Sequence, residues 1–115
     1  MADRDALPLL KGTLDLLVLK TLSWGPMHGY GIASWLESRS EGALGVDDSA
    51  LYQALHRLEE RGLLAAEWGV SENNRRARYY RLTKRGEAGL RSEARTWERY
   101  ARTVHEILVV SSRAG

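Results

Sequence analysis

Residues 49–62 read SALYQALHRLEERG, and residues 75–86 read RRARYYRLTKRG. In the first stretch apolar residues recur at helical spacing and form one face, while polar residues form the opposite face. A helix of this kind can bury one side and enter a DNA major groove with the other. The second stretch places arginines at the end of a predicted hairpin, where they can grip the flanking phosphates. The pair predicts a winged helix-turn-helix fold, mainly α with a small β-hairpin.

The bulk composition is that of an ordinary globular domain. The chain has 115 residues, of which 43% are hydrophobic and 28% charged, which corresponds to about one domain. It contains no cysteine, so disulfides, thiolate metal sites and thiol nucleophiles are excluded. No apolar run approaches the roughly 20 residues of a membrane span. The first residues are too acidic, and their apolar stretch too short, for a signal peptide, so we expect a cytoplasmic protein with no membrane contact.

The net charge of +2 conceals an asymmetry between the two parts of the chain. Residues 1–72 carry six Lys and Arg against eleven Asp and Glu, whereas residues 73–115 carry eleven against four. Six of the later cations fall within eleven residues: Arg75, Arg76, Arg78, Arg81, Lys84 and Arg85. Such clustering is typical of a polyanion-binding surface, although a solvated charged surface is an alternative interpretation.

Two helices are predicted before residue 49. The first begins with Thr13 as its N-cap and is apolar nearly all round, so it needs cover on more than one side. In so small a protein, a second subunit is the simplest second cover. The sequence Trp24-Gly25-Pro26 ends this helix. The next helix is expected to begin near residue 27 or 28 and to run to about residue 39, and its two early glycines suggest close packing.

The deciding stretch itself predicts a helix and two strands. The third helix is capped by Asp47, Asp48 or Ser49 and ended by Gly62. Residues 64–70 then alternate at period two, which predicts a half-buried strand. A turn over residues 71–74 leads into a return strand that faces inward with Tyr80 and Leu82, and together these strands form the wing.

A long helix of about 26 residues, roughly 39 Å, is predicted after residue 83. Its apolar residues recur as a heptad seam: Leu90, Ala94, Trp97, Ala101, Val104 and Leu108. A helix of this length cannot pack wholly on one small domain, so the seam predicts a homodimer. We therefore divide the chain into a DNA-binding domain, residues 1–83, and a dimerisation helix, residues 84–115. The residues expected at the dimer interface are Leu14, Leu17, Leu90, Trp97, Val104 and Leu108.

Four blocks of the chain resemble the PadR family of bacterial transcriptional regulators. They are LLKGTLDLLVLKTL (9–22), GPMHGYGIA (25–33), SALYQALHRLEERGLL (49–64) and RRARYYRLTKRGE (75–87). The resemblance implies a winged helix and a homodimer in which the C-terminal helix packs on the first helix of the other subunit. It also implies repression of a nearby operon. The single C-terminal helix resembles the short branch of the family.

The expected partner is double-stranded DNA with a roughly palindromic operator, because a dimer presents two recognition helices about one turn apart, ~34 Å. The residues expected to contact DNA are Ser49, Tyr52, Gln53, His56, Arg57, Arg75, Arg76 and Arg78. Gln53 stands where family members often have proline, and it either bonds an adenine edge or is a neutral helix residue. Tyr52 either holds phosphate or packs on the wing. Arg57 is a phosphate ligand or half of a salt bridge.

The resemblance also implies an effector, because short family members bind flat aromatic compounds between their C-terminal helices at a tryptophan. Trp97 is the comparable residue, with Trp24 and Trp35 as candidate neighbours, and a plain packing role for Trp97 is the alternative. The chain has no HExxH motif, phosphate loop or nucleophile elbow, so we expect no catalytic residue, metal or cofactor, and no enzyme.

Three functions remain open at this stage. The first is a dimeric repressor relieved by a small aromatic effector. The second is a multidrug-binding sensor at the dimer interface, and the third is a winged-helix module that binds protein without specific DNA binding. Arginine rather than apolar residues in the wing favours the first function over the third.

Overall fold

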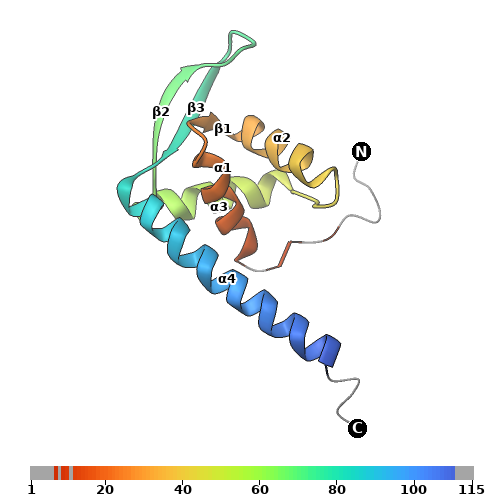
Figure 1. The fold of residues 1–115 in the computed structure, drawn as a ribbon. Coiled ribbons are helices and arrows are strands. Elements are labelled where there is room, and N and C mark those ends of the chain that lie inside the picture. The colour runs from red at the N-terminus through yellow and green to blue at the C-terminus, as the bar shows by residue number, and fades with distance from the viewer. Residues whose placement is uncertain (1–6, 8, 11, 111–115) are drawn as a thin grey trace.

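The computed structural model describes residues 7, 9–10 and 12–110, and the account below is confined to them. The elements follow in the order α1 (Thr13–Leu22), β1 (Met27–His28), α2 (Gly29–Ser40), α3 (Asp48–Glu60), β2 (Leu64–Val70), β3 (Arg76–Leu82) and α4 (Lys84–Val110). Figure 1 shows α1, α2 and α3 packed together, with the β2–β3 hairpin and α4 leaving them in different directions. The predicted class, mainly helical with a small β-hairpin, is confirmed.

The sheet has one strand more than the sequence predicts. Its antiparallel order is β1-β3-β2, and the two residues of β1, Met27 and His28, pair with Tyr80 and Tyr79. The helix predicted to begin near these two residues is α2, and its first residue is Gly29. His28 is the N-cap of α2 and has extended backbone angles (φ −86°, ψ 169°), so it can pair with a strand while its side chain caps the helix.

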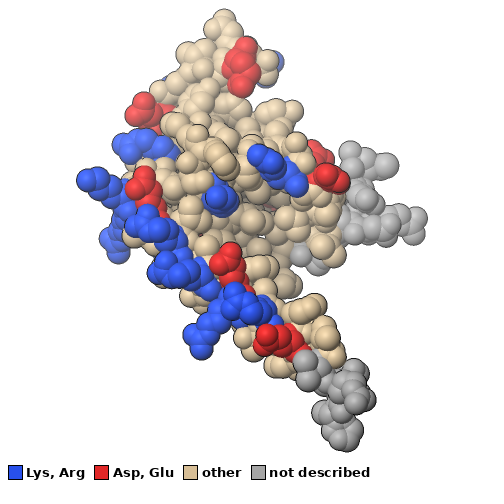
Figure 2. Space-filling model, in the orientation of Figure 1, with Lys and Arg blue, Asp and Glu red and all other residues tan. Residues whose placement is uncertain are grey.

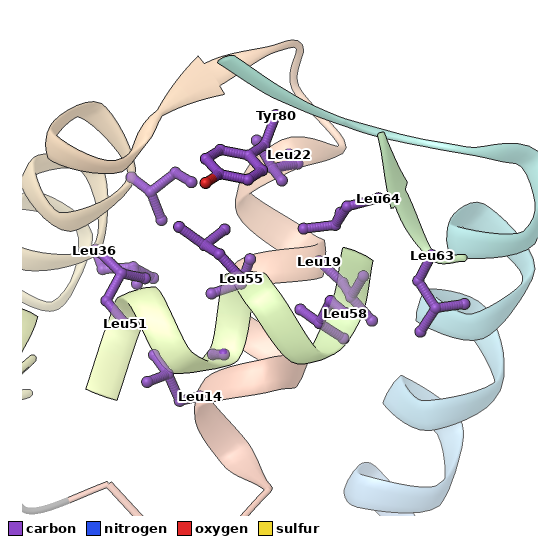
Figure 3. Close-up of a cluster of buried hydrophobic side chains, with 13 residues drawn as sticks. Leu14, Leu19, Leu22, Leu36, Leu51, Leu55, Leu58, Leu63, Leu64 and Tyr80 are labelled. Atoms are coloured by element: carbon purple, nitrogen blue, oxygen red, sulfur yellow. The ribbon is translucent and has the colours of Figure 1, made fainter. Parts of the chain in front are cut away.

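The core lies between α1, α2, α3 and the base of the hairpin (Figure 3). The predicted apolar face of α3 is confirmed, because Leu51, Ala54, Leu55 and Leu58 are at most 1% exposed. Burial of each leucine side chain stabilises the fold by roughly 1.5–3 kcal/mol. Tyr80 from β3 closes this core at 6% exposure, also as predicted.

The ends of α3 and the start of α4 are fixed by local hydrogen bonds. The Asp47 carboxylate accepts the Ala50 N–H at 3.0 Å, so the predicted cap is present. At the other end the Leu63 N–H donates to the Leu58 carbonyl at 2.9 Å and Gly62 has φ +78°, as in a Schellman motif. The Thr83 hydroxyl donates to the Gly62 carbonyl at 2.7 Å, which ties the start of α4 to the end of α3.

Two expectations about α1 were wrong. Its N-cap is Gly12 in a left-handed conformation, with no side-chain cap, and Thr13 is the first helical residue. Leu14, expected at a dimer interface, is 7% exposed within the chain's own core. Leu17 is half-buried and packs against the edge of that core. Most of the cover that α1 needs therefore comes from the same chain.

The outer half of the wing is exposed, although its alternating sequence predicts a half-buried strand. Leu64 at the base is buried, whereas Trp68 and Val70 are 57% and 67% exposed. The hairpin extends past the helices (Figure 1), so its inward-facing side has no apolar neighbour near the tip. Period-two alternation reports which side faces inward, and the length of the neighbouring elements decides how much of it is covered.

The predicted long helix is present as α4, with 27 residues. Its first turns pack on α1 and β3, and the remainder carries a stripe of exposed apolar side chains. The members of this stripe, which we call the α4 stripe, are Trp97, Tyr100, Val104, Ile107 and Leu108.

Candidate nucleic-acid interface

The polar face of α3 forms one continuous surface. The predicted contact residues Ser49, Tyr52, Gln53, His56 and Arg57 line a single shallow hollow of about 490 Å³, and all five are exposed. The structure therefore brings together every α3 residue that we expected to touch DNA. Helical periodicity alone was sufficient to find them, because α3 is straight, capped at both ends and covered on one side only.

Tyr52 packs on the start of α2 rather than on the wing. A Cβ atom on Gly29 would lie 2.8 Å from the Tyr52 hydroxyl and 3.0 Å from its ring, so only glycine lets the ring lie there. This close approach is the packing reason expected for Gly29. It does not extend to Gly31, where an added Cβ would meet His28 at an ordinary 3.5 Å. Gly29 thus sets the position of a hydroxyl on the candidate DNA face.

Arg57 forms a salt bridge, the second of its two predicted alternatives. Its Nη2 donates to the Asp15 carboxylate at 2.7 Å and its Nε does so at 3.4 Å. The hydrogen bond with Asp15, together with the charge of that carboxylate, raises the pKa of Arg57 further above its ordinary value. The pair joins α3 to α1. The remaining exposure of the Arg57 side chain, 52%, keeps it at the edge of the DNA face.

A larger groove separates the wing from the helices. It has a volume of about 770 Å³, and Tyr30, Tyr52, Trp68, Arg75 and Arg76 are among the residues that line it. It adjoins the hollow on α3, because Tyr52 lines both. A cationic groove next to a polar recognition face fits a sugar–phosphate strand beside the major groove.

The three wing arginines differ in their surroundings, although the sequence suggests three equivalent free cations. The Arg76 guanidinium lies over the Trp68 ring, 4.3 Å from its centroid. The Arg78 Nη2 donates to the Glu59 carboxylate at 2.8 Å and lies near the Tyr80 ring. Arg78 is therefore not an unpaired cation as expected, since α3 supplies a carboxylate for it, although its side chain remains 41% exposed. Arg75 is exposed at the end of the turn.

The basic cluster of residues 75–85 divides into two surfaces in the fold. Arg75, Arg76 and Arg78 lie on the wing, while Lys84 and Arg85 begin α4. Arg81 lies near the end of β3 and is exposed. Figure 2 shows further Lys and Arg side chains along α4 with acidic side chains between them. The wing and α4 are thus separate basic surfaces, and only the wing adjoins the face of α3.

Three residues that sequence analysis left out also lie at this interface. Trp68 stacks on Arg76, Tyr30 is 75% exposed beside the groove, and His28 contacts the turn of the wing. The His28 Nε2 lies 3.0 Å from the Glu72 Oε1. Accepting this hydrogen bond lowers the pKa of Glu72 below its ordinary value. Proximity in the fold creates all three roles, and no local spacing in the sequence signals them.

The three tryptophans named for an effector do not share a pocket. Trp24 lines a pocket of about 510 Å³ with Leu90 and Arg91 of α4, and that pocket includes neither of the other two. Trp35 is half-buried against the core and lies beside Arg39. Trp97 is 44% exposed on the α4 stripe. A site that uses Trp97 therefore needs further cover from outside this part of the chain.

The described residues show neither a metal cluster nor a membrane span. Within residues 7, 9–10 and 12–110, no three His, Cys, Asp or Glu side chains group as metal ligands would. Across the same part of the chain, no helix is both long and apolar enough to cross a bilayer.

Comparison with known proteins shows similarity to transcriptional regulators. Residues 18–92 match the PadR-like family of transcriptional regulators. The chain is 35% identical over 95 residues to the transcriptional regulator Rv3488 of Mycobacterium tuberculosis, an alignment that covers 82% of this chain and 84% of the relative.

Solved structures agree with the sequence match. A PadR family transcription regulator from Clostridium difficile R20291 superposes with a TM-score of 0.73 at 27% identity, covering 84% of this chain and 99% of the other. A PadR family regulator from Eggerthella lenta gives a TM-score of 0.69 at 33% identity, covering 85% and 83%.

Proposed function

Because this chain belongs to the PadR-like family of transcriptional regulators, whose members are regulators rather than enzymes, we propose that it acts in the cytoplasm as a dimeric, sequence-specific repressor. In this proposal the DNA-binding domain lies within residues 1–83, and the dimerisation segment, which contains α4, lies within residues 84–115. The observation that carries the proposal is the exposed polar face of α3 beside the cationic groove of the wing.

We infer that α3 enters the major groove with its polar face. The Gln53 amide is suited to bond the N6 and N7 edge of adenine, and His56 lies one turn further along the same face. His56 also lies 3.3 Å from the Glu60 carboxylate, which orients its ring. Tyr52 also lines the groove of the wing, and the hydroxyls of Ser49 and Tyr52 can bond phosphate oxygens.

The wing supplies affinity without base readout. Arg75 and Arg76 can neutralise phosphates of the strand that occupies the groove, and release of counterions then makes binding salt-dependent. Arg78 acts differently, because its pairing with Glu59 fixes the wing to α3. Arg57 has the same position-fixing role through Asp15 and contributes at most a peripheral phosphate contact.

The α4 stripe supports a homodimer. Five large apolar side chains exposed on one helix are an association surface. Leu17 and Leu90, also expected at the interface, are partly buried and pack against the core. Two copies joined in this way present their α3 helices about one DNA turn apart, ~34 Å, which calls for a roughly palindromic operator.

The same interface offers a place for a small aromatic effector. Trp97 lies on the stripe and is partly exposed, and Trp24 borders a pocket with α4. A flat ligand stacked on Trp97 between two copies would shift their separation and relieve repression. Trp35, held in its own core beside Arg39, has no part in this proposal.

Fluorescence anisotropy with labelled DNA from the chain's own promoter tests the proposed function. Excess nonspecific DNA at near-physiological salt removes generic phosphate binding. The proposal predicts nanomolar binding that survives this competitor, as is usual for specific DNA-binding proteins. Binding that the competitor abolishes would reduce the protein to a generic DNA binder. Loss of all binding would instead favour the protein-interaction module.

A further inference from the structure

A side-chain hydrogen bond joins the turn of the wing to the start of α2. The His28 Nε2 lies 3.0 Å from the Glu72 Oε1, and these residues are 44 positions apart in the sequence. The His28 side chain is 13% exposed and the Glu72 side chain is 80% exposed. A half-buried side chain at the start of α2 thus holds an exposed group in the turn of the wing.

The other ring nitrogen of His28 determines which proton makes this contact. The Gly31 N–H donates to the His28 Nδ1 at 3.0 Å, so Nδ1 carries a lone pair and no proton. The proton of the neutral ring is therefore on Nε2, where it donates to the Glu72 carboxylate. One imidazole caps α2 and holds the wing at the same time.

Aromatic packing keeps the ring of His28 in place. Its ring meets the Tyr79 ring edge-on at 5.2 Å, and the Tyr79 hydroxyl donates to the Val70 carbonyl at 3.1 Å. A Cβ on Gly69 would lie 3.0 Å from the Tyr79 ring, so glycine is needed for this ring to lie across β2. The contacts connect β2, β3, α2 and the turn of the wing.

We propose that His28 and Glu72 are positioning residues that set the angle of the wing for DNA, an inference that rests on the proposed function. Arg78 joins the wing to α3 through Glu59, and β1 pairs with β3 at two residues. The turn lies beyond these contacts, in the outer part of the wing where Trp68 and Val70 are exposed. Glu72 lies three residues before Arg75, close to the expected phosphate contacts. A carboxylate there repels DNA, and its bond with His28 gives it a role that offsets this repulsion.

Two uncharged substitutions of Glu72 separate position from charge. Glu72→Gln keeps an oxygen that accepts the His28 proton, whereas Glu72→Ala does not, and both remove the same charge. Each Glu72 substitution is made in two backgrounds, one that retains His28 and one that carries His28→Asn. Asparagine is a good N-cap and preserves the start of α2, but it is too short to reach the wing. Promoter-DNA affinity is measured for all four variants.

With His28 present, we expect Glu72→Ala to bind DNA about 2- to 10-fold more weakly than Glu72→Gln, the range that corresponds to one hydrogen bond. With His28→Asn the two substitutions should bind equally. Equal affinities in both backgrounds would overturn the proposal. The proposal would also be overturned if Glu72→Ala and Glu72→Gln differed in DNA affinity by the same factor in both backgrounds, because glutamine would then contact DNA directly.

Amide hydrogen exchange of the free protein tests the same contact without DNA. Residues 71–75 should exchange faster in Glu72→Ala than in Glu72→Gln, and only with His28 present. Equal exchange would refute the positioning role even if DNA binds. Failure of the unmodified protein to bind promoter DNA would instead refute the proposed function, and hydrogen exchange would still decide whether His28 holds the wing.

Discussion

The two amphipathic helices α3 and α4 expose opposite kinds of surface. In α3 the apolar stripe is buried to within 1% exposure, and a polar face remains outside. In α4 the apolar stripe itself remains outside, with Trp97 at 44% and Leu108 at 70% exposure. The same amphipathic sequence pattern thus leaves a polar face exposed on α3 and an apolar face exposed on α4. In the proposed function, the uncovered face of α3 binds DNA and the uncovered face of α4 binds a second copy.

Helix length explains the difference. The 13 residues of α3 span about 20 Å, which matches a small helical core, whereas the 27 residues of α4 span about 40 Å. The first turns of α4 lie against α1 and β3. The rest extends beyond the domain (Figure 1), and its apolar side chains are exposed in the described part of the chain.

The largest expected effect comes from charging the α4 stripe. Val104→Asp with Leu108→Asp should convert dimers to monomers, because two carboxylates would be buried at the interface. Loss of the second half-site should weaken operator binding by about 10²- to 10⁴-fold. Analytical ultracentrifugation and anisotropy measure the two effects.

Ser92→Asp with Thr103→Asp is the matched control for the stripe. Both residues are exposed on α4 and lie off the stripe, and the change in charge is the same. This control should remain dimeric. If it dissociates as readily as the stripe variant, charge rather than the apolar seam governs association.

The two faces of α3 should respond in opposite ways. Leu55→Ala empties a fully buried site and should lower the free energy of unfolding by about 2–5 kcal/mol. Gln53→Ala lies on the exposed face and should change it by less than about 0.5 kcal/mol. Urea denaturation measures both. Anisotropy should show weaker operator binding for Gln53→Ala, and unchanged binding would assign Gln53 to the neutral alternative.

Two glycines at the start of α4 test how it joins the core. A Cβ on Gly86 would overlap the carbonyl oxygen of Leu63, whereas one on Gly89 would meet the Leu63 side chain at an ordinary 3.5 Å. Gly86→Ala should therefore destabilise the fold by about 1–3 kcal/mol. Gly89→Ala should stabilise it by about 0.5–1 kcal/mol, since alanine favours the helix. Similar thermal shifts for both would show that α4 is not held against Leu63.

Substitution of Arg75 and of Arg78 should change the salt dependence of DNA binding differently, because Arg78 is paired with an acidic side chain. Arg75→Ala should reduce the salt dependence of DNA binding by up to about 0.9 per lost phosphate contact. Arg78→Ala should leave that slope unchanged, because its charge is paired with Glu59. Titrations at several salt concentrations measure the slopes. A reduced slope for Arg78→Ala alone would reverse the two assigned roles.

The smallest expected effect is a change in stability at acid pH. The hydrogen bond from His28 lowers the pKa of Glu72, so the carboxylate stabilises the folded state above the ordinary glutamate pKa, about 4.3. This contribution should disappear as the pH falls through the lower pKa of the folded state. The stability difference between the unmodified protein and Glu72→Gln should therefore shrink below about pH 4. A stability difference that does not change with pH would show that titration of Glu72 does not alter the strength of this contact.

Most of the fold follows from periodicity and caps. The face of α3, its Asp47 cap and its Gly62 end were predicted, because each depends on residues within one or two turns of each other. The seam of α4 was predicted in the same way. The strand β1 was not, since two residues carry no period and their pairing depends on β3 folding against them.

The candidate site was only partly predictable for the same reason. The residues on α3 follow from one helical face, but the pairing of Arg78 with Glu59 and the stacking of Trp68 on Arg76 join separate elements. Leu14 shows a different limit of the sequence. An apolar side chain predicts burial, but it does not show which chain buries it. Local pattern identified the surfaces, and tertiary contacts assigned roles within them.

The stoichiometry of the operator complex tests the central claim most directly, because it requires both the face of α3 and the α4 stripe to act together. Sedimentation velocity of the protein with a fluorescent promoter duplex measures it, with the Val104→Asp, Leu108→Asp variant alongside. The account predicts two chains per duplex and no stable complex for the variant. One chain per duplex, bound as tightly with or without an intact stripe, would contradict it.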